Sequence, residues 1–128
     1  MQPFPLSILP YKLAICRLEP SANLPDWLFH LPFWSATYTG DEISIIVPEE
    51  NVPANCQSEN HWSCLKVHGP LDFGLTGILA SLTSPLAEAG IPVFTLSTFE
   101  TDYLMIKDTD LEKTIAVLRN QGHQIIKP

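Results

Sequence analysis

Two features between His68 and Lys107 have residue types that can bind a charged ligand. Gly74 and Gly77 lie where apolar residues begin to recur at helical spacing, and the first N–H groups of a helix favour a carboxylate or a phosphate. Asp102 closes the segment Ser-Thr-Phe-Glu-Thr-Asp, where its carboxylate can meet a cation. The two features together suit a zwitterion such as a free amino acid.

A simpler interpretation exists for the same residues. Asp102 is also a common turn residue, and glycines before a helix also serve only to let backbones pack closely. Short motifs of this kind match by chance often, so the pattern alone leaves both interpretations open.

The elements that must position these residues follow the order strand, helix, strand, strand, helix, strand. Alternation and helical spacing place them at residues 61–67, 75–89, 93–96, 103–106, 110–121 and 123–126. Gly90 and Gly122 end the two helices. This order is that of the ferredoxin-like fold, in which two helices cover one face of an antiparallel sheet.

The first half of the chain has a shortened version of the same order. Strand patterns occupy residues 11–18, 33–39 and 42–47, with a hairpin turn at Gly40-Asp41, and helical spacing predicts a helix over 24–31. A polar, turn-rich stretch from Glu49 to Glu59 follows. We therefore expect an α+β fold of two ferredoxin-like units, residues 1–58 and 59–128, each an antiparallel sheet with helices packed on one face.

Composition excludes several classes of partner. The formal net charge is −7 and Lys and Arg form no cluster, which argues against binding nucleic acid or an anionic membrane surface. No apolar run approaches the length of a bilayer span, and the proline-containing N-terminus does not resemble a signal peptide. Three cysteines, an odd number, indicate reduced thiols and a cytoplasmic location.

Other reactive residues do not form a recognisable site. Cys56, His61, Cys64 and His68 are close in sequence, but they lack paired metal-ligand spacing, and strand parity directs His61 and Cys64 to opposite faces. No nucleophile elbow, phosphate loop or dinucleotide fingerprint occurs. We expect no bound metal, no cofactor and no enzymatic activity.

The motif Ser97-Thr98-Phe99-x-x-Asp102, preceded by Pro-Leu-Ala-Glu-Ala-Gly-Ile at 85–91, resembles the tandem ACT-domain proteins. These include small bacterial ACT proteins and the CASTOR arginine sensors. The likeness extends over nearly the whole chain and is strongest from Trp62 to Lys107. It implies two ACT-like units and a regulatory or sensing role in binding a small amino acid. Separately, the high apolar content and the low charged content lead us to expect a homodimer, in which a second copy covers apolar surface.

The resemblance also implies a set of ligand-binding residues in a pocket between ACT units. One group, at a loop and helix start, holds the carboxylate end of the ligand or lines the pocket: Asp72, Phe73, Gly74, Leu75, Gly77 and Leu79. A second group, at a strand end, holds the amino group or the side chain: Thr98, Phe99 and Asp102. The alternatives for these residues are backbone capping by Thr98 and core packing by Phe99, Leu75 and Leu79.

One residue departs from the pattern of the arginine sensors, which have a glutamate where this chain has Leu75. A glutamate pairs naturally with a guanidinium through two charge-assisted hydrogen bonds. Its absence favours a smaller or more apolar amino acid. A second functional class stays open, an oligomerisation or protein-interaction module that has no ligand.

Overall fold

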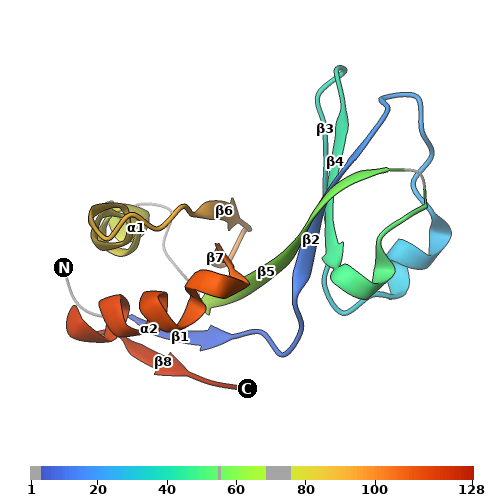
Figure 1. Cartoon of the computed structure of the whole chain (residues 1–128). Helices are drawn as coiled ribbons and strands as arrows, with labels where there is room; N and C mark the ends of the chain where they lie inside the picture. The colour runs from blue at the N-terminus through green and yellow to red at the C-terminus, as the bar shows by residue number, and fades with distance from the viewer. Residues whose placement is uncertain (1–3, 55, 69–75) are drawn as a thin grey trace. The chain divides into compact units, whose positions relative to one another are not determined.

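The structure, a computed structural model, describes residues 4–54, 56–68 and 76–128. Contacts divide the chain into two compact units, of which unit 1 comprises Met1–Pro10 and Ser63–Pro128 and unit 2 comprises Tyr11–Trp62. Figure 1 traces both, and strand β5 (Gln57–Val67) contributes residues to each. The N-terminal ten residues, which the sequence pattern assigned to the first unit, make their contacts in the unit that contains the second half of the chain.

Unit 1 is built from the end of β5 and seven further elements. In chain order these are β1 (Pro5–Ile8), α1 (Ile78–Glu88), β6 (Phe94–Ser97), β7 (Asp102–Lys107), the 3₁₀ turn η3 (Asp108–Asp110), α2 (Leu111–Asn120) and β8 (Gln124–Ile126). The predicted order from residue 61 onward is confirmed. Both helices end before a glycine with positive φ, Gly90 at +75° and Gly122 at +93°, a conformation that glycine adopts at no steric cost.

The strands of unit 1 pair in the order β6, β7, β5, β1 and β8. This is the ferredoxin-like order with one strand added, because β1 lies between β5 and β8. Strand β1 is antiparallel to β5 and parallel to β8. The sequence pattern assigned no strand to residues 1–10, so the parallel pair corrects the expectation of a purely antiparallel sheet. The α+β, ferredoxin-like fold class is otherwise confirmed.

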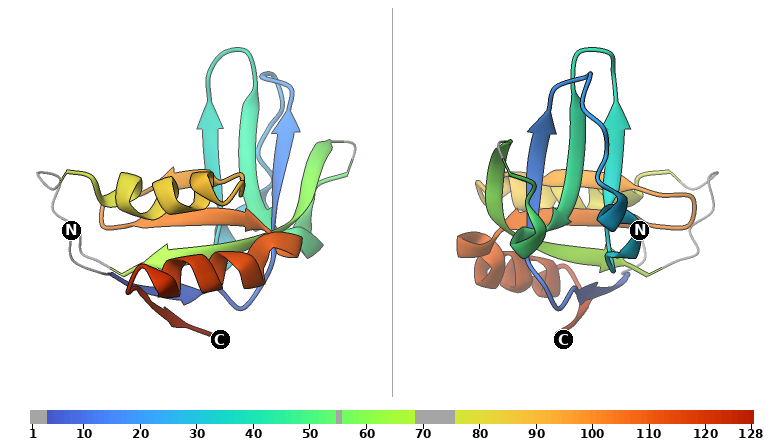
Figure 2. Two further views of the ribbon diagram at one scale, coloured as in Figure 1. Left: turned by 60° about the vertical axis from the view of Figure 1, so that its left-hand side comes forward. Right: turned by 90° about the vertical axis from the view of Figure 1, so that its right-hand side faces the viewer.

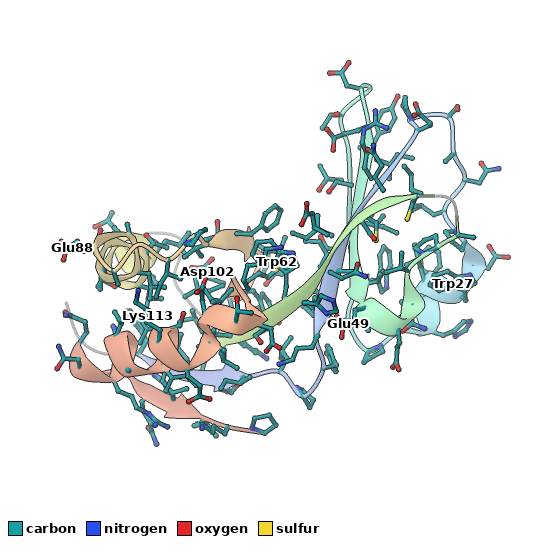
Figure 3. The ribbon with its side chains drawn as sticks, viewed as in Figure 1. Trp27, Glu49, Trp62, Glu88, Asp102 and Lys113 are labelled. Carbon is teal, nitrogen blue, oxygen red and sulfur yellow. The ribbon has the colours of Figure 1, made fainter. Side chains whose placement is uncertain are left out.

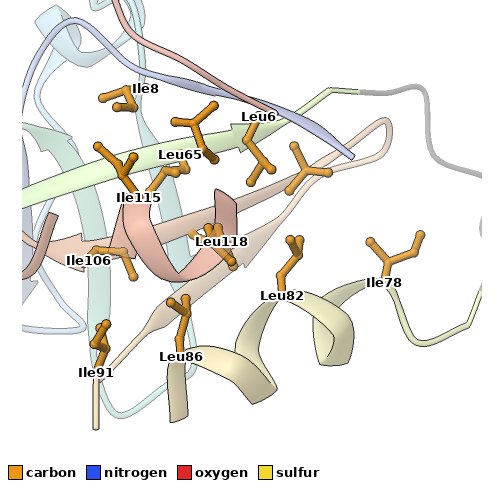
Figure 4. Packing of buried hydrophobic residues seen from close by; sticks show 13 residues of the cluster. Leu6, Ile8, Leu65, Ile78, Leu82, Leu86, Ile91, Ile106, Ile115 and Leu118 are labelled. Atoms are coloured by element: carbon orange, nitrogen blue, oxygen red, sulfur yellow. The ribbon is translucent and has the colours of Figure 1, made fainter. Parts of the chain in front are cut away.

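Both helices of unit 1 pack on one face of this sheet (Figure 2). Ile78, Leu82 and Leu86 recur along α1 and point into the same cluster as Ile115 and Leu118 of α2 (Figure 4). The sheet contributes its own buried residues to this cluster, namely Leu6, Ile8, Leu65, Val67, Leu104, Ile106 and Ile125. Helical spacing thus produces one apolar stripe on each helix, and burial of both stripes forms the core.

Thr114, in the middle of α2, is completely buried, and its hydroxyl has no hydrogen-bond partner in the described part of the chain. Since an unsatisfied buried hydroxyl destabilises a protein, we expect Thr114→Val to raise the free energy of unfolding by about 1 kcal/mol. Urea denaturation measures the change. Thr83→Val is the matched control, because the Thr83 hydroxyl donates to the Leu79 carbonyl at 2.8 Å. Equal effects of the two substitutions would contradict this explanation.

His123, the residue before β8, contacts Phe4, the residue before β1. The His123 ring is buried, and its Nδ1 accepts a hydrogen bond from the Phe4 N–H at 2.9 Å. The rings of Phe4 and His123 stack, with centroids 6.3 Å apart. Burial lowers the pKa of His123 below its ordinary value of 6.5. The neutral imidazole is the form that both burial and the accepted hydrogen bond require.

The stability of unit 1 is therefore expected to depend on this histidine. Because the folded-state pKa of His123 lies below the unfolded one, its contribution is complete above the ordinary value of 6.5 and is lost as the pH falls through the folded-state pKa. Urea denaturation at several pH values measures this loss. His123→Asn, which retains a short acceptor but does not titrate, should flatten the dependence. The exposed His30→Asn should leave it unchanged, and an equally steep fall in His123→Asn would contradict the assignment.

Unit 2 contains four strand segments that follow the ferredoxin-like order. These are β2 (Leu13–Leu18), β3 (Ser35–Tyr38), β4 (Ile43–Pro48) and the first part of β5, paired in the order β3, β4, β2 and β5. All of these pairs are antiparallel, and the predicted hairpin between β3 and β4 is confirmed. Ala14, Cys16, Ile43, Ile45 and Val47 face the unit's core, together with Leu28.

The helix predicted over residues 24–31 is wrong in type. The chain there forms the 3₁₀ helix η1 (Asp26–His30), and a second one, η2 (Glu49–Asn51), precedes β5. Pro25 and Pro32 enclose η1, and a residue before proline is disfavoured in the α conformation, so too few residues remain for a stable α-helix. Leu28 is nevertheless fully buried, which accounts for the apolar spacing in the sequence.

Candidate functional site

The β6–β7 hairpin, whose turn comprises residues 98–101, holds three of the predicted ligand-binding residues. Thr98 closes this four-residue turn, because its N–H donates to the Thr101 carbonyl at 2.8 Å and its hydroxyl donates to the same oxygen at 3.2 Å. Phe99 lies at the tip with 79% of its surface exposed. Asp102 is the first residue of β7 and pairs with Ser97, the last residue of β6. Thr98, Phe99 and Asp102 are thus brought together by one hairpin.

Asp102 has the geometry of a preorganised anionic group. The Ser97 hydroxyl donates to its Oδ1 at 2.6 Å, which holds the carboxylate in one orientation. Asp102 is labelled in Figure 3, and within the described ranges it makes no ion pair. A carboxylate that is oriented but not neutralised by the protein retains its capacity to bind an ammonium group.

Thr101 joins this turn to the end of β5. Its side chain is buried, and its hydroxyl donates to the carbonyl of Val67, the last residue of β5. The turn that precedes Asp102 is therefore attached to the end of β5.

The start of α1 contributes the other described candidates. Gly77 is the N-cap residue of the helix, with φ +75°, and it makes no side-chain cap hydrogen bond. The first N–H groups of a helix have no intrahelical partner, so they remain able to bind a carboxylate. Leu79 is half-buried and packs against the core of unit 1. The remaining candidates, Asp72, Phe73, Gly74 and Leu75, lie outside the described residues.

Sequence reasoning missed two residues that organise this site, Ser97 and Thr101. The sequence pattern placed both in a polar connection and gave neither a role in ligand binding, whereas Ser97 ends β6 and Thr101 lies at the last position of the turn. The available signal was the spacing, since Ser97 and Asp102 flank four residues between two short strands, as expected for the paired ends of a hairpin.

Two depressions in unit 2 are weaker candidates. Their volumes are about 450 and 690 Å³, and Arg17 lines both. The Arg17 guanidinium already donates to Glu19 Oε1 at 3.1 Å and to the Asp41 carbonyl at 3.2 Å. Among the described residues that line the two depressions, Arg17 is the only cation. Its guanidinium already makes these two hydrogen bonds, so we place the candidate site in unit 1.

Neither a metal centre nor a membrane span occurs among residues 4–54, 56–68 and 76–128. No three His, Cys, Asp or Glu side chains in these ranges gather to hold a metal ion. No helix there is both long enough and apolar enough to cross a bilayer. Cys64 is fully buried, whereas the His61 side chain is 76% exposed.

Similarity to known proteins identifies the family. The family model of the ACT domain matches residues 57–120, half of the chain. The chain belongs to the ACT-domain family. A second family model, of an N-terminal domain, matches residues 11–55. The ACT match covers both helices of unit 1, the β6–β7 turn and Asp102.

Relatives of known structure and known description support this membership. A crystal structure of a protein from Agobacterium tumefaciens is 38% identical, with a TM-score of 0.92, and the match covers 100% of this chain and 96% of that one. The cytosolic arginine sensor for mTORC1 subunit 1 of Bos taurus is 31% identical over 100 residues, 70% of this chain and 30% of the relative. The match thus spans about 30% of that relative's length.

A more distant structure shares the fold alone. The regulatory subunit of aspartate kinase from Thermus thermophilus has a TM-score of 0.64 at 7% identity, and the match covers 90% of this chain and 95% of that subunit. The two proteins therefore share the fold although their sequences have few residues in common.

Proposed function

We propose that this ACT protein is a non-enzymatic regulatory module that senses a small amino acid. The observation that carries the proposal is the Asp102 carboxylate, which is oriented by Ser97 and has no ion pair in the described part of the chain. Family membership supports it, because the matched relatives include arginine sensors and the regulatory subunit of an amino-acid kinase.

In this proposal the two ends of the ligand bind to two elements of unit 1. The α-ammonium group pairs with Asp102, and Phe99 covers an apolar side chain. The α-carboxylate accepts N–H groups at the start of α1, where the helix dipole adds attraction. A second ACT unit closes the site, which makes the ligand a regulator of that interface.

The preferred ligand is an amino acid without a guanidinium group. Leu75 replaces the glutamate that the resemblance assigns to arginine recognition, so a buried guanidinium would lack its carboxylate partner. We therefore place a small or apolar amino acid in the site. The protein acts in the cytoplasm as a homodimer in this proposal, and its relatives' description as cytosolic sensors supports that location.

A thermal-shift panel of the twenty amino acids at millimolar concentration tests the proposal. An amino acid present at about 100 times its Kd should stabilise the protein by about 2.7 kcal/mol, a shift of roughly 8 °C. The N-acetyl derivative of that amino acid, which lacks the ammonium group, and its amide, which lacks the carboxylate, should both lose most of the shift. An unchanged shift with the N-acetyl derivative would contradict the role of Asp102.

A second function, as a protein-interaction module without a ligand, is favoured by one observation. Trp27, Phe29 and Tyr38 of unit 2 are exposed by 40%, 64% and 68%, and exposed aromatic residues are frequent in interfaces. If no amino acid shifts the melting temperature and light scattering gives the mass of a tight dimer, this second function replaces the first.

A further inference from the structure

Strand β3 forms one edge of the unit 2 sheet (Figure 2). Within the residues that the structure describes, β3 pairs only with β4, in a regular register from Ser35 to Tyr38. One row of its backbone N–H and C=O groups therefore faces away from the sheet and can pair with a further strand. Proteins often block such an edge with a lysine, a proline or a bulge, but β3 contains none of these. This edge is open to the addition of a strand.

Exposed side chains line the sheet face beside this edge. Ala36 and Tyr38 lie opposite Ile45 and Ile43, which belong to the core of unit 2. Cross-strand partners point to the same side of a sheet, so Ala36 and Tyr38 project on the core side. Both are nevertheless exposed, Tyr38 by 68%. The core of unit 2 thus ends before the edge strand.

The short helices of unit 2 explain this exposure. The 3₁₀ helices η1 and η2 have five and three residues, whereas α1 and α2 of unit 1 have 11 and 10. Helix η1 buries Leu28 in the core, and its exposed Phe29 ring contacts Trp34 edge to face, with centroids 4.9 Å apart. We call Phe29, Trp34, Ala36 and Tyr38 the β3 strip. Its aromatic rings stay accessible to a partner.

The segment that contains the β3 strip is acidic. Residues 26–50 include five carboxylates and no Lys or Arg. Asp26 begins η1 and Asp41 follows β3, and both are exposed and make no ion pair within the described ranges. The Arg17 guanidinium donates to the Asp41 carbonyl, but its charge is paired with Glu19 at 3.1 Å. The strip therefore favours a partner with positive charge.

We propose that the β3 strip docks an extended segment of a partner protein that is rich in Lys or Arg. The segment adds to the sheet of unit 2 as a strand beside β3, and its backbone pairs with the open edge. Its cations are attracted by Asp26 and Asp41 and lie against the rings of Phe29 and Tyr38. The proposal names the partner of the second function given above, on which it rests, and it shares no residue with the candidate amino-acid site.

Charge distinguishes this partner from the other occupants of an open edge. A second copy of the chain would bring the same five carboxylates against those of the first copy, and juxtaposed like charges oppose association. Nucleic acid and anionic membrane surfaces are repelled for the same reason. A cationic extended segment satisfies both the backbone edge and the carboxylates.

Fluorescence anisotropy with synthetic peptides tests the proposal. The probe is a labelled decapeptide of alternating lysine and valine, which combines positive charge with a high strand propensity. It should bind the full-length protein at low ionic strength and bind more weakly as salt is added. The same peptide with glutamate in place of lysine should bind at least about tenfold more weakly. A fully N-methylated lysine–valine peptide keeps the charge but has no backbone donor, so it should also lose most of the affinity.

Two substitutions at one exposed position provide the matched variants. Ala36→Lys places a like charge against the probe and should weaken binding about tenfold, whereas Ala36→Glu should bind at least as tightly as the original protein. Thr95→Lys is the control, because Thr95 is exposed on β6 in unit 1 and adds the same charge away from the strip. Ala36→Lys should leave any amino-acid-induced thermal shift unchanged.

Four outcomes would overturn the proposal. These are equal affinity for the lysine and glutamate peptides, undiminished binding of the N-methylated peptide, equal losses in Ala36→Lys and Thr95→Lys, and a dimer that forms through β3 without binding the probe. The last outcome leaves the interaction function standing and replaces only its partner. In the unmodified protein, amide chemical shifts that move at residues 34–38 on addition of the probe support the same conclusion independently of any variant.

Discussion

The Asp102→Asn variant is expected to bind its amino acid about 100-fold more weakly than the original protein, because a charge-assisted hydrogen bond contributes about 1.5–3 kcal/mol. Asparagine has the same shape and retains an acceptor for the Ser97 hydroxyl, so the turn should keep its structure. At a ligand concentration that stabilises the original protein by about 2.7 kcal/mol, the variant should gain only about 0.4 kcal/mol. Thermal shift and isothermal titration calorimetry measure both quantities.

Glu100→Gln is the matched control for this loss. Glu100 lies in the same turn, is exposed, and loses one negative charge in the same way. Its substitution should change the affinity less than threefold at physiological salt, since exposed charges are largely screened by water and ions. If both variants lose affinity equally, the ligand is attracted by the net negative charge of the hairpin, and Asp102 makes no specific contact with it.

The Leu82→Ala variant is expected to lower the free energy of unfolding by about 3 kcal/mol. Leu82 is fully buried in the middle of α1, where it contacts the cluster that includes Leu118 and Ile106 (Figure 4). Removal of its three terminal carbons loses apolar burial and leaves a cavity that the surrounding helices fill only in part. Urea denaturation followed by circular dichroism measures the change.

Glu88→Ala provides the comparison for Leu82→Ala on the same helix. Glu88 is exposed, and alanine has a high helix propensity, so this substitution should alter the free energy of unfolding by less than about 0.5 kcal/mol. A loss below about 1 kcal/mol in Leu82→Ala would show that α1 does not form part of the cooperative core. That result would also weaken the case for an anion site at the start of the helix.

The sequence predicted most of the elements near the candidate site because their residues are periodic or end at glycine or proline. The apolar stripe of α1, the two short strands β6 and β7, and the helix α2 all follow from local spacing. Strand β1 could not be predicted in the same way, since Pro5–Ile8 lacks any pattern that identifies its partner strands. Its place between β5 and β8 depends on residues about sixty and one hundred and twenty positions away in the chain.

At residues 24–31 the sequence predicted an element of the wrong type, an α-helix in place of a 3₁₀ helix. Leu24, Leu28 and Leu31 have helical spacing and do pack against the core of unit 2. Spacing reports which residues are buried, but it does not distinguish a short α-helix from a 3₁₀ helix enclosed by prolines. Backbone constraints at Pro25 and Pro32 decided the type of helix.

For the candidate site, the sequence by itself determined the residue types: an aspartate, an aromatic ring and two threonines in one polar segment, and glycines before a helix. Tertiary structure decided that Ser97 orients the Asp102 carboxylate and that Thr101 attaches the turn to the end of β5. The physical reason is that pairing across the hairpin and burial of Thr101 against β5 bring together groups that are separate along the chain, and local spacing contains no information about such contacts.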